Sequence, residues 1–126
     1  MSNVARMEIP NRMQCMTFPL NIDNVFYRVT LDYITTDTGI TVVAIWVRTK
    51  KSESTLDREA RSDGKATSLL LQFGCSLKEM VDTFTRDNVI GSVVWYVQKN
   101  LEDILEGNQP DKIPQLSTQP SGYTIK

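Results

Sequence analysis

Two arginines in the predicted strands have the chemistry to hold an anionic ligand. Arg28 lies among apolar neighbours within one strand, and Arg48 ends the next strand beside Lys50 and Lys51. A guanidinium group binds phosphate through two parallel hydrogen bonds, so either arginine can contribute to an anion site. Each also has a structural interpretation. Arg28 can pair with Asp32 or lie exposed on the sheet, and the basic residues around Arg48 can form a solubilising turn.

A second group of candidate residues surrounds the start of the last predicted helix. Arg86 and Asn88 precede that helix, where free backbone N–H groups favour phosphate, although the same residues can serve only to cap it. Trp46, Phe84 and Trp95 have flat side chains that can stack on a base or fill the core. The predicted ligand-binding residues are therefore Arg28, Trp46, Arg48, Phe84, Arg86 and Asn88.

The chain offers little for catalysis. It contains no histidine, which removes the commonest general base, the histidine-dependent nucleophile arrangements and most zinc sites. It contains neither a Walker loop nor a GxGxxG motif. Its carboxylates have spacings typical of solvated helix faces, although a pair from distant segments could still converge. They are Glu53, Asp57, Glu59, Asp63, Glu79, Asp82, Glu102, Asp103 and Glu106. We therefore predict a binding protein without catalytic residues, metal site or cofactor.

Composition indicates one ordinary globular domain. The chain has 126 residues, of which 40% are hydrophobic and 23% charged, so it can bury a core without disulfides or metal. Fourteen basic and fifteen acidic residues give a net charge of −1, which argues against binding DNA or RNA polymers because they require a basic face. A pocket with two or three arginines for one small anion remains compatible with this balance.

Cysteine use and hydropathy suggest a cytoplasmic protein. Cys15 and Cys75 belong to no CxxC pair and are predicted to be buried reduced thiols, although spacing alone leaves a disulfide open. The N-terminus lacks the apolar segment of a signal peptide, and no run of apolar residues is long enough to span a bilayer. We therefore expect no membrane partner.

The chain divides into three parts. Residues 1–11 are predicted to be a flexible N-terminus, and residues 12–106 an α+β ligand-binding domain. Residues 107–126 contain three prolines and two glycines, which exclude a long helix or a central strand. This tail is either disordered or an extended arm on a partner. The apolar residues that could anchor such an arm are Ile113, Leu116, Tyr123 and Ile125.

The first half of the domain has the period-two pattern of strands. Strands are predicted over 13–20, 24–34 and 40–47, with a turn ending at Gly39 joining the last two as an antiparallel hairpin. In the second strand, alternate residues from Val25 to Tyr33 form one apolar face. The third strand is apolar on both faces, which predicts a central strand or one at a subunit interface.

The second half has the pattern of helices. Ser54 is a plausible N-cap for a helix that ends at Gly74, with Gly64 marking close packing or a break. Its expected buried residues are Leu56, Ala60, Thr67, Leu69, Leu70 and Phe73. Ser76 and Glu79 form a capping box for a second helix, and a third runs over about 90–105. The predicted fold is α+β, with an antiparallel β-meander followed by two or three helices packed on one face in two layers.

The stretch EARSDGKATSLLLQFGCSLKEMVDTFTRDNVIGSVVWYVQKNL resembles the TSCPD-type domain. That domain occurs at the C-terminus of cobalamin-dependent ribonucleotide reductases and in small free-standing phage and bacterial proteins. The matching positions are 69–74, 76–81, Arg86–Asp87 and Gly91, and the apolar strand VVAIWV precedes them, so the resemblance covers about 12–105. The chain lacks the cysteine–proline pattern that names the domain, which argues against a metal or redox role.

Among free-standing proteins of this shape, the chain looks most similar to the first-described anti-Thoeris (Tad) family. That resemblance implies a phage anti-defence sponge, which binds a cyclic ADP-ribose isomer made by a bacterial TIR enzyme without cleaving it and so blocks Thoeris immunity. It also implies a homo-oligomer in the host cytoplasm, either a dimer or a hexamer built as a trimer of dimers. Some members of that family also bind cyclic oligonucleotides. The alternatives are a ribonucleotide-reductase-related accessory domain, which would bind a nucleotide or a protein partner, and a structural phage protein.

Overall fold

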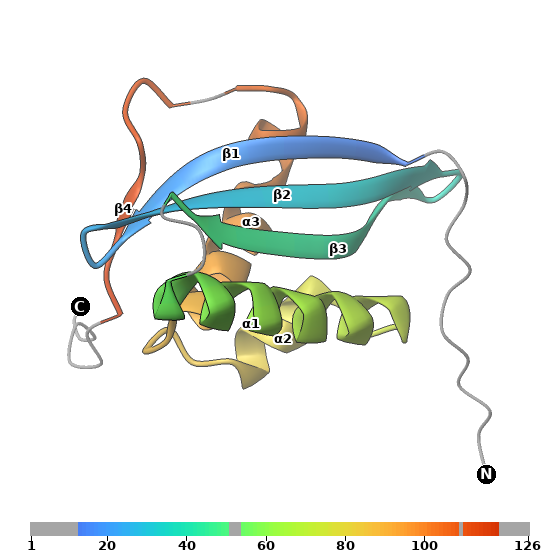
Figure 1. Ribbon diagram of the computed structural model, residues 1–126. Coiled ribbons are helices and arrows are strands. Elements are labelled where there is room, and N and C mark those ends of the chain that lie inside the picture. The colour runs from blue at the N-terminus through green and yellow to red at the C-terminus, as the bar shows by residue number, and fades with distance from the viewer. Residues whose placement is uncertain (1–12, 51–53, 109, 119–126) are drawn as a thin grey trace, which may run out of the picture.

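The computed structural model describes residues 13–50, 54–108 and 110–118. Their order along the chain is β1 (Gln14–Ile22), β2 (Val25–Thr36), β3 (Gly39–Thr49), α1 (Thr55–Gln72), α2 (Leu77–Thr83), α3 (Val89–Leu105) and β4 (Gln115–Leu116). The fold is α+β, as predicted: a curled, mostly antiparallel sheet with the helices on one side of it (Figure 1). The predicted flexible N-terminus, 1–11, and the tail anchors Tyr123 and Ile125 lie outside the described residues.

The sheet has the order β3-β2-β1-β4. β1 and β2 are joined by a tight turn at Asp23 and Asn24, whose φ angles of 52° and 66° are those of a type I′ hairpin turn. β2 and β3 form the predicted hairpin, in which Thr36 pairs with Gly39 and Gly39 has a φ of 129°. Only short polar side chains or glycine adopt positive φ readily, so these residues fix the positions of both turns.

One face of the sheet forms the core together with α3. The predicted alternation of β2 is confirmed, because Tyr27, Val29, Leu31 and Tyr33 are buried while Arg28 between them is exposed. The largest contributions from α3 are Val93, Val94 and Val97, each fully buried. Burial of this apolar surface is the main force that holds the helical layer on the sheet.

β3 lies at the edge of the sheet, so the prediction of a central strand is wrong. A register shift pairs Asp32 with Ala44 but Tyr33 with Val42, which leaves Val43 as an extra residue in a β-bulge. Val42, Val43 and Ala44 are consecutive and all buried. The bulge and the cover that α1 provides explain why the strand is apolar on both faces.

α1 runs along the free edge of β3 and binds its backbone (Figure 1). The Ser68 hydroxyl accepts a hydrogen bond from Ile45 N at 2.9 Å and donates to Ile45 O at 3.0 Å, and Gln72 Nε2 donates to Val43 O at 3.0 Å. A Cβ on Gly64 would lie 3.0 Å from Ile45 O, so the absence of a side chain allows this close approach. The helix continues through Gly64, which confirms close packing and not a break.

The buried face predicted for this helix is therefore largely wrong. Ala60 and Thr67 are buried as expected, but four of the six predicted residues are between 42% and 45% exposed. They are Leu56, Leu69, Leu70 and Phe73. The residues that actually face inward are Asp57, Ala60, Gly64, Thr67, Ser68, Leu71 and Gln72. A helix that caps a strand edge meets polar backbone groups, so small and polar side chains replace the expected apolar stripe.

The predicted helix ends are confirmed. Ser54 caps α1 by accepting from Asp57 N, and Ser76 and Glu79 form the capping box of α2. Asn88 caps α3 by accepting from Gly91 N at 2.7 Å. Of the described helices, none is both long and apolar enough to cross a membrane.

The tail after α3 returns to the sheet. Asn21 N donates to Pro114 O at 2.9 Å and Asp23 N donates to Leu116 O at 3.0 Å, so β4 pairs in parallel with β1. Leu116 is partly buried against the core. The described part of the tail is thus extended, and it lies on this chain's own sheet instead of on a partner because β1 has an edge free to receive it.

The prediction that both cysteines are buried is wrong. Cys15 lies exposed on β1, and Cys75 is half-buried in the turn after α1. Both thiols are free. Partial desolvation raises the pKa of Cys75 above its ordinary value, with the Glu79 carboxylate adding to the effect, so this thiol stays protonated near neutral pH.

Candidate functional site

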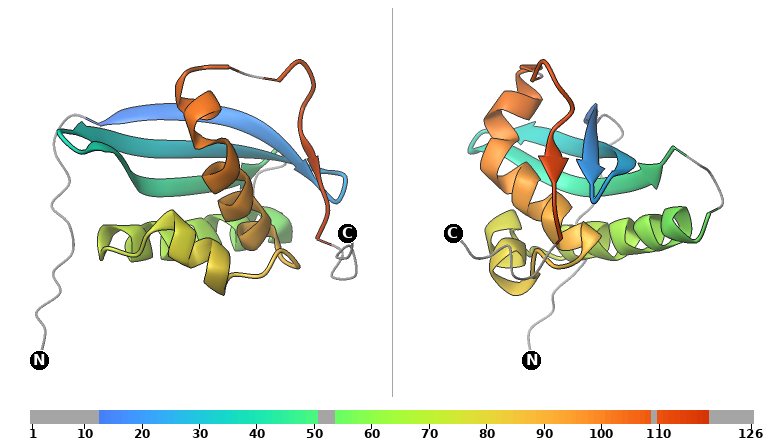
Figure 2. Two further views of the ribbon diagram at one scale, coloured as in Figure 1. Left: turned by 180° about the vertical axis from the view of Figure 1, so that it is seen from behind. Right: turned by 90° about the vertical axis from the view of Figure 1, so that its left-hand side faces the viewer.

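The sheet surface opposite the core carries three of the predicted site residues. Cross-strand pairing places Arg28 opposite Arg48, and Thr30 opposite Trp46. On the other side of β2, Thr17 faces Thr30, and their hydroxyls are hydrogen-bonded at 2.9 Å. None of the described helices covers this surface (Figure 2). We call it the open face, and it comprises Cys15, Thr17, Pro19, Arg28, Thr30, Asp32, Trp46 and Arg48.

Trp46 is held in a fixed orientation on the open face. Its indole Nε1 donates a hydrogen bond of 2.7 Å to Asp32 Oδ2, and the residue is 37% exposed. Asp32 therefore orients Trp46, and among the described residues it makes no ion pair with Arg28, which was one of the two structural interpretations of that arginine. The exposed ring is pre-oriented for stacking on a planar group.

Arg48 is tied to a buried carboxylate at the end of β3. Its guanidinium donates to both oxygens of Asp57, with Nε–Oδ1 and Nη2–Oδ2 distances of 3.2 and 3.4 Å. Arg61, one helical turn after Asp57, has its Nε 3.4 Å from Asp57 Oδ2. Asp57 also accepts from Thr49 N at 2.9 Å. The carboxylate is completely buried, so the prediction that Asp57 belongs to a solvated face is wrong: a buried charge must be paired, and hydrogen bonds from Arg48 and Thr49 together with the Arg61 ion pair satisfy it.

The two arginines that share Asp57 keep much of their surface free. The Arg48 and Arg61 side chains are 46% and 37% exposed. Arg28 is exposed directly across the sheet from Arg48, and no side-chain hydrogen bond or ion pair joins it to any described residue. Arg48 and Arg61 thus share one carboxylate, and Arg28 lies across the sheet from Arg48. Like charges placed directly opposite on a sheet repel, so an anion bound between them would relieve the repulsion.

The other three predicted residues have structural contacts in the helical layer. Arg86 stacks on Trp95 with its Cζ 4.0 Å from the ring centroid, and Lys99 Nζ lies 5.3 Å from the same centroid. Asn88 is the cap of α3, and Phe84 is half-buried against the core. The capping alternative for Asn88 is therefore confirmed, while a ligand-binding role for this segment stays a prediction.

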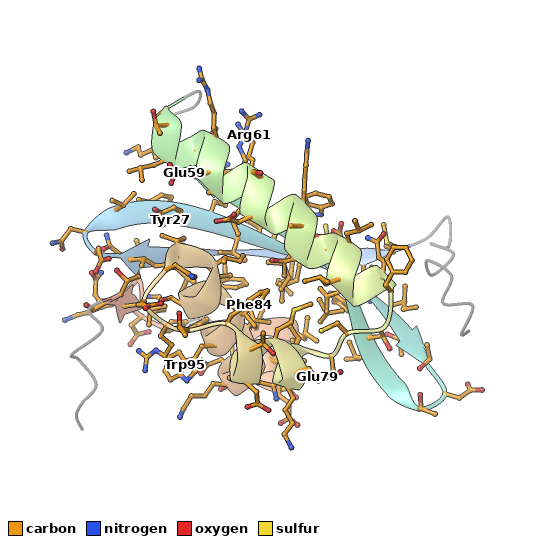
Figure 3. The ribbon with its side chains drawn as sticks, turned by 90° about the horizontal axis from the view of Figure 1, so that it is seen from below. Tyr27, Glu59, Arg61, Glu79, Phe84 and Trp95 are labelled. Atoms are coloured by element: carbon orange, nitrogen blue, oxygen red, sulfur yellow. The ribbon has the colours of Figure 1, made fainter. Side chains whose placement is uncertain are left out.

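The six predicted residues do not form one site. Arg28, Trp46 and Arg48 share the open face, whereas the segment from Phe84 to Asn88 joins α2 and α3 on the opposite side of the sheet (Figures 1 and 3). In four clefts lined by described residues, none of the six side chains takes part. One of these clefts, with a volume of about 400 Å³, borders the open face at Thr17 and Pro19.

Sequence reasoning missed Asp57 and Arg61. The available signal was the series of small and polar residues at Asp57, Arg61, Gly64, Ser68 and Gln72, which lie on one side of a helix at intervals of three or four. Such a stripe indicates a helix packed on a polar surface.

Within the described residues, no group of three or more cysteine or acidic side chains is arranged to hold a metal ion. Comparisons of the chain with models of known families, with curated proteins and with solved structures gave no match.

Proposed function

We propose that this protein is a non-enzymatic binding protein that holds a small phosphorylated nucleotide on the open face. The proposal is carried by one observation: Arg28 lies opposite Arg48, next to Trp46, without an anionic partner among the described residues. An arginine pair can grip phosphate groups bidentately, and the indole can stack on the base.

The contacts of Asp57 support a site that is formed before the ligand arrives. Because Asp57 pairs with Arg48 and Arg61 before any ligand is bound, these long side chains lose less freedom on binding. Trp46 is likewise held by Asp32. A protein that sequesters a signal needs tight binding, and preorganisation raises affinity without any catalytic group.

The resemblance described above suggests the ligand. We propose a TIR-derived cyclic ADP-ribose isomer, held intact so that the depleted signal fails to activate Thoeris immunity in the host cytoplasm. Its pyrophosphate suits paired guanidinium groups, and its adenine suits Trp46. Binding of cyclic oligonucleotides is a further proposal on the same resemblance.

We also propose that the protein acts as a homo-oligomer. The exposed apolar side chains of α1 support this, since Leu69, Leu70 and Phe73 lie within a span of five residues and each is more than 40% exposed. A contiguous exposed apolar patch is typical of a protein interface.

Calorimetric titration with cyclic ADP-ribose isomers tests the function. We expect saturable binding, recovery of unchanged ligand after the complex is heated, and binding by Arg28→Gln that is about 10- to 100-fold weaker. Arg86→Gln is the matched control, because it removes the same charge on the other side of the sheet. Absence of binding to the unaltered protein at micromolar concentration contradicts the proposal. Loss of binding in Arg86→Gln alone would move the site to the Phe84–Asn88 segment.

A further inference from the structure

A separate cleft lies between the C-terminal part of α3, β1 and the tail. It has a volume of about 270 Å³ and is lined by Phe18 of β1, by Tyr96, Asn100 and Asp103 of α3, and by Asn108 and Pro110 of the tail. In Figure 2 the tail rises from the end of α3 and passes over β1 before it reaches β4. None of these residues belongs to the open face, so the cleft is independent of the proposed nucleotide site.

A kink in α3 shapes one wall of this cleft. Asn100 has non-helical φ and ψ angles of −120° and 18° inside the helix. Its side-chain Nδ2 donates to Tyr96 O, one helical turn earlier, at 2.9 Å. The kink therefore lies at a polar residue that also lines the cleft.

One carboxylate and two side-chain amides supply polar atoms to the cleft. Asn100 Nδ2 donates to Tyr96 O, and Asn108 Nδ2 donates to Glu106 Oε1 at 3.3 Å, so each amide nitrogen has one of its two hydrogens engaged within the chain. Their amide oxygens remain as acceptors. The Asp103 carboxylate makes no hydrogen bond or ion pair with any residue that the structure describes, and no basic residue is among those that line the cleft.

The remaining walls are aromatic and apolar. The rings of Phe18 and Tyr96 pack with centroids 5.8 Å apart, and Ile104 is buried beside them. Burial, with the nearby Asp103 carboxylate, raises the pKa of Tyr96 above its ordinary value, so the phenol is neutral at physiological pH. Aromatic faces next to a carboxylate are a favourable environment for an ammonium group.

We propose that this cleft binds a small organic cation, an ammonium compound with an apolar body. The Asp103 carboxylate and the two amide oxygens receive the N–H groups, and the apolar body lies against Phe18, Tyr96 and Ile104. The small volume selects a compact ligand, because pockets for larger small molecules typically start at about 300 Å³.

The test uses 2-phenylethylamine as the probe and amide chemical shifts as the measurement. We expect saturable shifts confined to the cleft, including the backbone amides of Ile104 and Asn108. The uncharged 2-phenylethanol and the anion phenylacetate are probes of similar shape, and both should bind about tenfold or more weakly, because neither supplies the charge-assisted hydrogen bond. Equal binding of the alcohol and the amine would overturn the proposal, as would the absence of saturable shifts at millimolar amine.

Two variants assign the effect to the carboxylate. Asp103→Asn keeps the shape of the side chain and removes its charge, and should weaken amine binding by about tenfold. Glu102→Gln is the matched control, since Glu102 is exposed on the same helix turn and does not line the cleft. Both residues are exposed, so the fold should persist in each variant. Unchanged affinity in Asp103→Asn, or equal loss in Glu102→Gln, contradicts a specific site.

Discussion

Asp57 shows how a single residue can connect the fold with the candidate site. Its carboxylate accepts from the backbone of β3 at Thr49 and from the guanidinium group of Arg48, and it forms an ion pair with Arg61. The same carboxylate therefore holds α1 against the end of β3 and holds two arginines beside the open face. Removing it affects both stability and binding, and the two effects need separate controls.

At Asp57 we expect a large loss of stability on substitution. Asp57→Ala should lower the free energy of unfolding by about 2–4 kcal/mol, because Thr49 N–H loses its acceptor in a buried position and two arginines lose their shared anion. Urea denaturation measures the change. Asp63→Ala on the exposed side of the same helix is the control and should stay within about 0.5 kcal/mol of the unaltered protein. Similar small changes in both variants would show that the Asp57 contacts contribute little.

At the scale of the elements, α1 covers the outer edge of β3 and the tail covers the end of β1. Side chains of α1 bind the outer backbone of β3, and the tail strand β4 pairs with the last part of β1. Covered edges prevent a strand from pairing with other molecules. The tail pairing is short, and a second contact supports it: the Asp23 carboxylate accepts from the backbone N–H and from the hydroxyl of Thr118.

We predict that acid weakens the tail contact. The hydrogen bonds from Thr118 lower the pKa of Asp23 below its ordinary value of 3.8. A lowered pKa means that the contribution to stability is complete above the ordinary value and is lost as pH falls through the folded-state pKa. The chemical shift of the Thr118 amide proton should therefore titrate with a midpoint below 3.8.

Asp23→Asn provides the control for that titration. It keeps an acceptor oxygen but cannot ionise, so the acid titration at Thr118 should disappear while the rest of the spectrum is retained. A midpoint at or above the ordinary value in the unaltered protein would show that the tail is not held by the charged carboxylate.

At the scale of the whole molecule, the two faces of the sheet differ sharply. One face is buried under the helices, and the other carries polar and charged residues that none of the described helices covers. Stability should therefore depend on one face and ligand binding on the other. Adjacent residues of β2 allow this division to be tested, because Arg28 and Val29 point to opposite faces.

We expect the free energy of unfolding to respond strongly to substitution at Val29 and weakly at Arg28. Val29 is completely buried, and Val29→Ala should lower the free energy of unfolding by about 2 kcal/mol or more. Arg28→Gln should change it by less than about 0.5 kcal/mol, or raise it slightly, because it removes repulsion with Arg48. Thermal or urea unfolding of the two variants distinguishes the effects. A large destabilisation by Arg28→Gln would mean that this residue has a structural role. Weaker nucleotide binding by that variant would then not indicate direct contact with the ligand.

The sequence by itself determined what depends on neighbours along the chain. The sequence predicted the alternation of β2 and the glycine turn before β3. It also predicted the helix caps at Ser54, Ser76 and Asn88 and the end of α1 at Gly74. Each of these features follows from local geometry and local hydrogen bonds. The fold class follows from the order of those elements. Arg28, Trp46 and Arg48 could be nominated singly, but their grouping depends on strand register.

Only the tertiary structure decided which surfaces meet. It placed β3 at an edge, laid α1 along that edge, buried Asp57 and brought Asn100, Asp103 and the tail around one cleft. The sequence pattern of a single helix could not show which of its faces is buried. A polar side chain is solvated on an open helix face, and the same side chain is buried where the helix meets the free N–H and C=O groups of a strand edge. Which of the two occurs depends on contacts between segments far apart in the chain, and those contacts form only when the whole core packs.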